Sequence, residues 1–127
     1  MLLEGRNAIV YGGGGSIGGA MARAFAAQGA HVFLAGRTQD PLDKVAGQIR
    51  DKGGRAETAV VDALDEAAVD AHADQVAAAG GIRISVNVVT DHDVQGKPAA
   101  EMAVADYVAP VEAGLRSRFL TARAAAR

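Results

Sequence analysis

The sequence of 127 residues contains no cysteine and no long apolar run. The lack of cysteine excludes a disulfide-stapled fold, a thiolate metal centre and a cysteine nucleophile. No apolar stretch approaches the length of about eighteen residues that a membrane-spanning helix needs. The first ten residues, MLLEGRNAIV, carry charges at Glu4 and Arg6 and do not have the pattern of a signal peptide. We therefore expect a cytoplasmic protein without a membrane partner.

Excess charge of either sign is also lacking. Thirteen basic and fifteen acidic residues give a formal net charge of −2, and the basic residues are scattered along the chain. This distribution does not indicate a nucleic-acid partner. Half of the residues are hydrophobic, and the length suffices for one domain with a core but not comfortably for two. We expect a single domain over residues 1–127.

The stretch AIVYGGGGSIGG, from Ala8 to Gly19, carries the strongest local signal. A short apolar run ends in four glycines, and Ser16 begins a segment with the apolar spacing of a helix. A strand, a glycine turn and a helix in this order open a dinucleotide-binding βαβ unit, in which a pyrophosphate rests on backbone N–H groups at the helix N-terminus. Glycine suits the turn because a Cβ would hold the phosphate away from the amides. We expect Ser16 to be the N-cap of the helix.

Two registers of the glycine motif fit this loop. Gly13, Gly15 and Gly18 have the spacing G-x-G-x-x-G, whereas Gly12, Ser16 and Gly18 occupy the glycine positions of G-x-x-x-G-x-G. The alternative is a glycine-rich surface turn, but the flanking strand and helix favour a nucleotide site. The cofactor contacts expected from this loop come from Gly12, Gly14, Gly15, Ser16, Ile17 and Gly18.

Strand and helix patterns alternate along the rest of the chain. We expect strands over residues 7–11, 31–36, 56–62 and 82–89. Helices are expected over residues 16–28, from Asp40-Pro41 to the glycines at 53–54, and from a cap at Asp65 to the glycines at 80–81. The alternation predicts an α/β fold with a Rossmann-like, doubly wound parallel sheet in the order 3-2-1-4. The ligand crevice is expected between strands 1 and 4, where the strand order reverses.

The last segment, residues 104–126, predicts one long or broken helix that Pro110 and Gly114 distort. Its apolar stripe consists of Val104, Val108, Val111, Leu115 and Phe119. An unpaired fourth strand and this stripe would both be exposed, so we expect a homo-oligomer that associates through the strand-4 edge or the last helix.

The end of the second strand bears on the choice of cofactor. A site for NAD normally has an acidic residue there, which hydrogen-bonds the ribose 2′-hydroxyl. This chain has Gly36 and Arg37 instead. A guanidinium at this place would pair with a 2′-phosphate, although an ordinary solvated arginine is the alternative. NADP(H) is therefore the preferred cofactor, with NAD(H) possible.

The run VYGGGGSIGGAMARAFAAQGAHVFLAGRT resembles the opening of a short-chain dehydrogenase/reductase, with Tyr11 and Ser16 replacing the threonine and the middle glycine of the family fingerprint. The resemblance implies that Asp62, next to Ala63, bonds the adenine amino group. It also implies that Asn87 is the retained first residue of an Asn-Asn-Ala-Gly motif at the cofactor site. Gly114 stands where the family places a catalytic asparagine.

The resemblance further implies that hydride transfer depends on a tyrosine, which donates or removes the carbonyl proton, with a lysine four positions later. Here Gly15 follows Tyr11 at that spacing, and Val111 follows Tyr107. We therefore expect no catalytic residue in this chain, which resembles the truncated, cofactor-binding half of an NADP(H)-dependent oxidoreductase about twice as long. The alternative is a non-catalytic nucleotide-binding or interaction module that has lost the active site.

Two of the three histidines, His92 with its neighbouring aspartates and His72, are the remaining candidates. Asp91, His92 and Asp93 follow the fourth strand and could form a metal site or an acid/base group, but a solvated polar loop is the favoured interpretation and no metal is expected. His72 is expected to be a half-buried helix residue without a catalytic role.

Overall fold

The computed structural model describes residues 1–90 and 92–127. In chain order, its elements are β1 (Asn7–Tyr11), α1 (Ser16–Ala27), β2 (His31–Gly36), α2 (Gln39–Asp51), β3 (Arg55–Val60), α3 (Glu66–Ala78), β4 (Ile84–Asn87), a short 3-10 helix (Ala99–Glu101) and α4 (Val104–Ala126). The strands form one parallel sheet in the order β3-β2-β1-β4. This arrangement confirms the predicted Rossmann-like fold and strand order.

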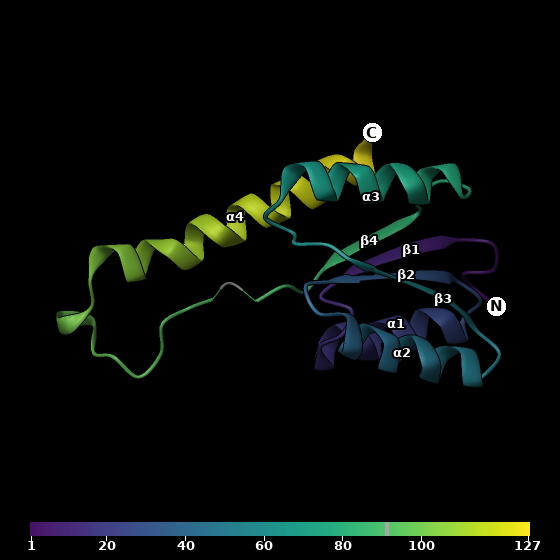
Figure 1. The fold of residues 1–127 in the computed structure, drawn as a ribbon, viewed down its shortest axis with the longest axis horizontal. Helices are drawn as coiled ribbons and strands as arrows, with labels where there is room; N and C mark the ends of the chain where they lie inside the picture. Colours follow the sequence, from purple (N-terminus) through teal and green to yellow (C-terminus); the bar gives the residue numbers. More distant parts are fainter. Residues whose placement is uncertain (91) are drawn as a thin grey trace.

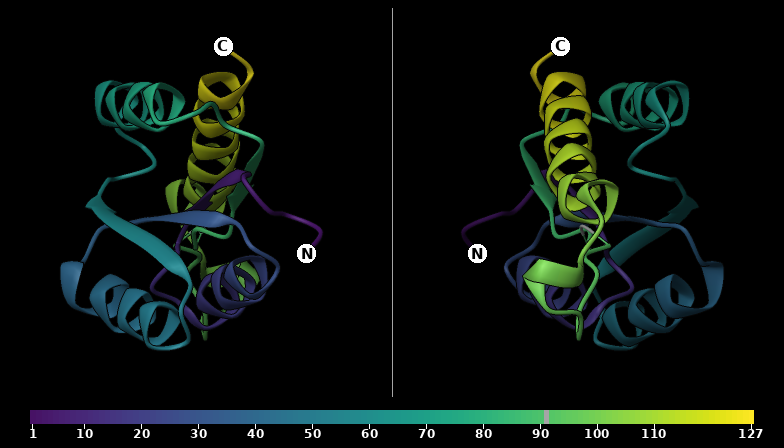
Figure 2. Two further views of the ribbon diagram at one scale, coloured as in Figure 1. Left: turned by 90° about the vertical axis from the view of Figure 1, so that its right-hand side faces the viewer. Right: turned by 90° about the vertical axis from the view of Figure 1, so that its left-hand side faces the viewer.

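Helices cover both faces of the sheet. Figures 1 and 2 show α1 and α2 on one face and α3 and α4 on the other, with the N-terminal half of α4 extending past the sheet. All five residues of β1 are buried, as an apolar strand between two helical layers must be. Among the described helices, none is long and apolar enough to cross a membrane.

The fourth strand is shorter than expected, because its partner ends first. β1 pairs with β4 from Ala8 opposite Ile84 to Tyr11 opposite Asn87. Beyond this point the N–H of Val88 still donates to the carbonyl oxygen of Tyr11 (3.0 Å), but the glycine turn follows Tyr11 and offers no further ladder. The predicted range 82–89 was too long at both ends, and the end of β1 accounts for the difference at the C-terminal end.

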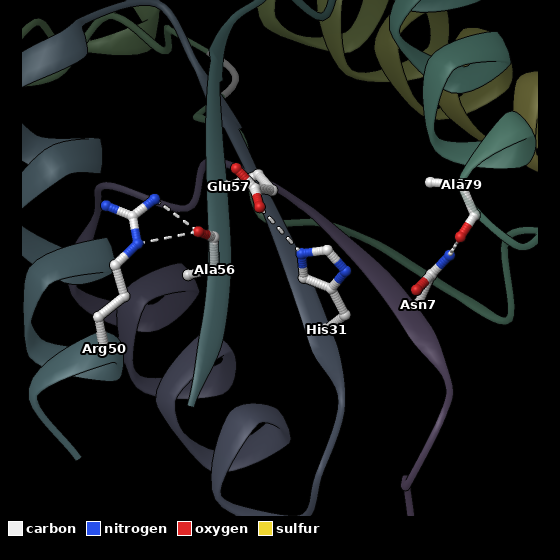
Figure 3. A network of polar contacts seen from close by, with 6 residues as sticks. All are labelled: Asn7, His31, Arg50, Ala56, Glu57 and Ala79. Carbon is white, nitrogen blue, oxygen red and sulfur yellow. Dashed lines mark hydrogen bonds and ion pairs between the residues drawn. The ribbon is translucent and has the colours of Figure 1, made fainter. Parts of the chain in front are cut away.

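Side chains fasten the helices to the sheet (Figure 3). The amide nitrogen of Asn7, at the start of β1, donates to the carbonyl oxygen of Ala79 (3.3 Å) at the C-terminal end of α3. The guanidinium of Arg50 on α2 donates twice to the carbonyl oxygen of Ala56 on β3, at 3.1 and 2.6 Å. These bonds satisfy carbonyl groups at a helix end and on the outer strand.

The predicted start of α1 at Ser16 is confirmed, but its predicted N-cap and the predicted start of α2 were wrong. Gly15 is the N-cap of α1, so Ser16 is the first helical residue and caps nothing. Thr38 is the N-cap of α2, which therefore begins before Pro41 rather than at it. The third start was right: the Asp65 carboxylate accepts a hydrogen bond from the N–H of Ala68 (3.1 Å) at the head of α3.

Helix α4 is continuous, but its predicted apolar stripe faces solvent. Leu115 is 67% exposed and Phe119 is 61% exposed. The opposite side of the helix is buried instead, through Leu120 and the small or polar residues Gly114, Ser117, Thr121 and Ala124. Of the two predicted alternatives, one long helix is confirmed, since α4 runs without a break from Val104 to Ala126 with Pro110 inside it.

Candidate functional site

A cavity of about 250 Å³ opens at the edge of the sheet where all the strands end. The glycine turn after β1 lines it, together with residues 35–38 after β2, residues 61–64 after β3 and residues 88–90 after β4. In an open parallel sheet this edge, near the point where the strand order reverses, is where ligands bind. The cavity is thus wider than the predicted crevice between strands 1 and 4.

Two glycines of the turn are required by the fold itself. Gly12 has φ +82°, and a Cβ there would lie 2.9 Å from the carbonyl oxygen of Val88. Gly18, in the first turn of α1, touches the turn so closely that a Cβ would overlap the carbonyl oxygen of Gly12. These glycines let α1 pack against the end of β1.

Gly15 differs, because the surrounding protein does not demand a glycine there. A Cβ on Gly15 would meet only the carbonyl oxygen of Gly12, at an ordinary 3.4 Å. Gly15 is exposed, lines the cavity and is the N-cap of α1, whose first turn contains no acidic residue. The N–H groups of a first helical turn lack intrahelical acceptors, so they favour an anion at this place.

The structure brings together most of the predicted contact residues. Those that line the cavity are Gly12, Gly14, Gly15, Arg37, Asp62 and Ala63. Ser16 lies beside it in a neighbouring groove, the side chain of Ile17 is 68% exposed, and Gly18 is buried under the turn.

Charged side chains of opposite sign flank the cavity. Arg37, directly after β2, is exposed and has no ion-pair partner among residues 1–90 and 92–127. Asp62, after β3, accepts a hydrogen bond from the N–H of Leu64 (2.9 Å), which fixes its carboxylate. The cavity can therefore offer a free cation to a phosphate and an oriented acceptor to an amino group.

Asn87 lies apart from the other predicted residues. Its amide nitrogen donates to the hydroxyl oxygens of Ser117 (3.4 Å) and Thr121 (3.2 Å) on α4, and its oxygen accepts from the N–H of Val89 (3.1 Å). It does not line the cavity. Its side chain holds α4 against β4 instead.

Ser117 and Tyr11 line the cavity but were not among the contact residues predicted from the sequence. Ser117 of α4 is buried and lines the cavity, but no motif marks it. Tyr11 also lines the cavity, although only 1% of its surface is exposed. Tyr11 could have been predicted to line the cavity, because it is the last residue of the buried strand that ends there.

Tyr11 packs against a buried histidine. The rings of Tyr11 and His72 meet edge to face, with centroids 6.5 Å apart. Burial, together with the nearby Asp70 carboxylate, raises the pKa of Tyr11 to about 12. Burial lowers the pKa of His72, and its Nδ1 has no hydrogen-bond partner in the described part of the chain. His72 is 6% exposed and thus more deeply buried than expected.

The polar loop after β4 gives no support for a metal site. Asp91 lies outside the described residues, and His92 is exposed at the cavity edge with φ +57°. Within residues 1–90 and 92–127, no group of three histidine, aspartate or glutamate side chains is arranged to hold a metal ion.

The architecture and the cavity define an α/β protein of the dinucleotide-binding type, and the comparisons identify its family. The family model of the short chain dehydrogenases matches residues 6–127, so the chain belongs to this family of oxidoreductases. D-threitol dehydrogenase of Mycolicibacterium smegmatis is 31% identical over 122 residues, which cover 96% of this chain and 46% of that protein. An uncharacterised oxidoreductase of Bacillus subtilis, YxbG, is 31% identical over 124 residues, covering 95% of this chain and 44% of that protein.

Solved structures show the same relationship. A metagenomic short-chain oxidoreductase in complex with NADP is 33% identical, with a TM-score of 0.88 over 99% of this chain and 57% of that one. The hydroxysteroid dehydrogenase of Escherichia coli is 30% identical, with a TM-score of 0.84 over 98% of this chain and 50% of that one. The chain spans about half the length of these structures.

Proposed function

We propose that this chain binds a nicotinamide dinucleotide, with NADP(H) preferred to NAD(H), as the cofactor-binding half of a short-chain dehydrogenase/reductase-like oxidoreductase. The observation that carries the proposal is the cavity where the strands end, which combines an open helix N-terminus at Gly15 with the exposed guanidinium of Arg37. The similar metagenomic oxidoreductase, whose structure contains NADP, supports this choice of ligand.

Each part of the cavity suits one part of such a ligand. The backbone N–H groups from Gly14 to Ile17, with Gly12 and Gly18 shaping the turn, would receive the pyrophosphate. Arg37 would pair with the 2′-phosphate, and the carboxylate of Asp62 beside Ala63 would accept from the adenine amino group. Asn87 would act indirectly, by holding β4 against α4. When bound, the nicotinamide ring supplies or accepts a hydride.

We do not expect this chain alone to reduce a carbonyl. Tyr107 is 71% exposed on the part of α4 that extends past the sheet, and Val111 follows it where a lysine would be needed. Tyr11 is buried, and its raised pKa keeps the phenol neutral without a nearby lysine to lower it. The second candidate function is a non-catalytic nucleotide-binding or interaction module. It is favoured by Gly114, a buried residue of α4, because the family resemblance implies a catalytic asparagine at this position.

A fluorescence titration with NADPH and NADH tests cofactor binding. We expect NADPH to bind more tightly, and Arg37→Ala to remove that difference, because a charge-assisted hydrogen bond contributes about 1.5–3 kcal/mol. Arg55→Ala is the matched control, since Arg55 is also exposed but begins β3 at the opposite edge of the sheet. Equal affinities for the two nucleotides, or an unchanged ratio in Arg37→Ala, would contradict the preference.

A second variant separates ligand contact from folding. Gly15→Val should weaken both nucleotides and leave the circular-dichroism spectrum unchanged, because its Cβ has room in the protein but points at the proposed phosphate site. Undiminished binding would show that this end of α1 does not hold the ligand. A carbonyl-reduction assay with NADPH then distinguishes a binding module from an enzyme.

We also propose that two copies associate through α4. The exposed stripe of this helix includes Leu115 and Phe119. Acidic residues, Asp106 and Glu112, occur in its first half, whereas its second half carries Arg116, Arg118 and Arg123. Antiparallel pairing about a two-fold axis would bury the apolar stripes and place opposite charges together.

Sedimentation analysis at tens of micromolar tests this association. Leu115→Glu should yield monomers, whereas Val60→Glu, at a similarly exposed position on β3, should not. The reverse result would indicate pairing through the β3 edge of the sheet. A monodisperse monomer of the unaltered chain would rule out both surfaces.

A further inference from the structure

A groove between α1 and α2 continues from the proposed cofactor cavity. Its walls carry polar side chains from one face of each helix, namely Ser16 and Arg23 on α1 and Lys44, Gln48 and Lys52 on α2. The groove and the cavity share the rim formed by Gly14, Gly15 and Pro41. A ligand group seated at this rim would therefore face both hollows.

The groove is positively charged, with little compensation. Asp40 is the one carboxylate among the described residues that line it. The neighbouring Asp43 accepts hydrogen bonds from the side chains of Gln39 (2.7 Å) and Thr58 (3.4 Å), so it is engaged toward β3. In the part of the chain that the structure describes, neither Lys44 nor Lys52 forms an ion pair.

The cations lie on both sides of the shared rim. Arg37 lines the cavity on one side of Pro41, and Lys44 lines the groove on the other. Lys44 follows Pro41 by three residues, or about 4.5 Å along the helix axis, and its side chain has a long flexible stem.

We propose that Lys44 forms an auxiliary phosphate subsite which, together with Arg37, holds the 2′-phosphate of NADP(H) on the Pro41 side of the shared rim. Arg23, whose guanidinium donates to the side chain of Gln48 (3.0 Å), adds positive potential further along the groove. The inference rests on the proposed function and names a second determinant of its specificity. A phosphate between two cations is held more firmly than one beside a single exposed arginine.

The test is a titration of the full chain with NADPH and NADH at about 0.1 M salt. Because the pair would be exposed, Lys44→Gln should weaken NADPH binding about three- to fivefold. It should leave NADH unchanged, and the loss should grow at lower salt. The matched control is Lys52→Gln, at the far end of the same groove. Eight residues separate it from Lys44, which is about 12 Å along the helix and beyond the screening length of about 10 Å.

The outcomes separate this inference from the proposed function. If Arg37→Ala removes the preference for NADPH while Lys44→Gln changes nothing, the subsite is wrong but the cofactor assignment stands. Equal losses of NADPH affinity in Lys44→Gln and Lys52→Gln would contradict the subsite and indicate a diffuse positive potential instead. Equal weakening of NADPH and NADH binding would do the same. If the unaltered chain binds neither nucleotide, both proposals fail.

Discussion

Helices α2 and α4 both carry an apolar stripe at helical spacing, but the stripe of α2 is buried and that of α4 is exposed. On α2, Leu42, Val45 and Ile49 are buried and belong to the core cluster beneath β1 and β2. On α4, Leu115 and Phe119 face solvent. Apolar periodicity thus identifies a hydrophobic side of a helix, but it does not determine whether that side or the opposite one packs against the sheet.

Hydrogen bonding to the sheet accounts for the orientation of α4. Asn87 is a half-buried polar residue on the face of β4 that α4 covers, and such an amide needs partners. Ser117 and Thr121, one turn apart, supply them. Gly114 and Ala124 are small enough for a close approach on the same side. Once this side faces β4, the stripe must point away from it.

A pair of matched truncations tests this comparison and has the largest expected effect. Leu42 is 1% exposed, so Leu42→Ala should lower the free energy of unfolding by about 2–5 kcal/mol through lost burial and a cavity. Leu115→Ala removes the same atoms from an exposed site and should change it by less than about 0.5 kcal/mol. Urea denaturation at a protein concentration low enough to prevent association measures both. A large loss for Leu115→Ala would show that the outer side of α4 is covered within one chain.

The fold could be predicted because local signals in the first 80 residues mark each strand and helix, and these elements alternate along the chain. The buried run at β1, the glycine turn and the cap at Asp65 are all local signals. The cavity residues Arg37 and Asp62 were found because they follow strands whose ends meet at one edge. Their positions directly after predicted strands were sufficient to place Arg37 and Asp62 at the cavity.

Long-range contacts were what the sequence could not provide. Asn87 matched a family position, but its partners on α4 lie 30 and 34 residues away and only the fold places them together. Ser117 reaches the cavity for the same reason. Ser16 has the chemistry of a cap, but the turn geometry gives that position to Gly15. The groove with Lys44 arises only from packing α1 beside α2.

A second prediction contrasts a buried histidine with an exposed one. Burial lowers the pKa of His72 below its ordinary value of about 6.5. When the pH falls below that value, His72 is protonated in the unfolded chain but stays neutral in the folded chain. Stability should therefore fall as the pH decreases below about 7, by at most about 1.4 kcal/mol per pH unit for this one group. Urea denaturation between pH 7.5 and 5.5 measures the slope.

Two variants assign the slope to one residue. His72→Leu should flatten it, since the group that must remain neutral is gone. His92→Gln should leave it unchanged, because His92 is exposed at the cavity edge. If His72→Leu kept the full slope, the acid sensitivity would have to arise elsewhere in the chain.

The last prediction has the smallest effect and contrasts the starts of α3 and α4. The Asp65 carboxylate accepts from the N–H of Ala68 at the head of α3, whereas Ala103, the N-cap of α4, has no side-chain acceptor. Asp65→Ala should cost about 1 kcal/mol in urea denaturation, and Asp65→Asn, which keeps an acceptor, should cost much less. Ala103→Asp offers α4 the missing cap but should add little to global stability, because this end of the helix extends past the sheet and can open without exposing the core. A gain as large as the loss in Asp65→Ala would show that the start of α4 folds cooperatively with the sheet.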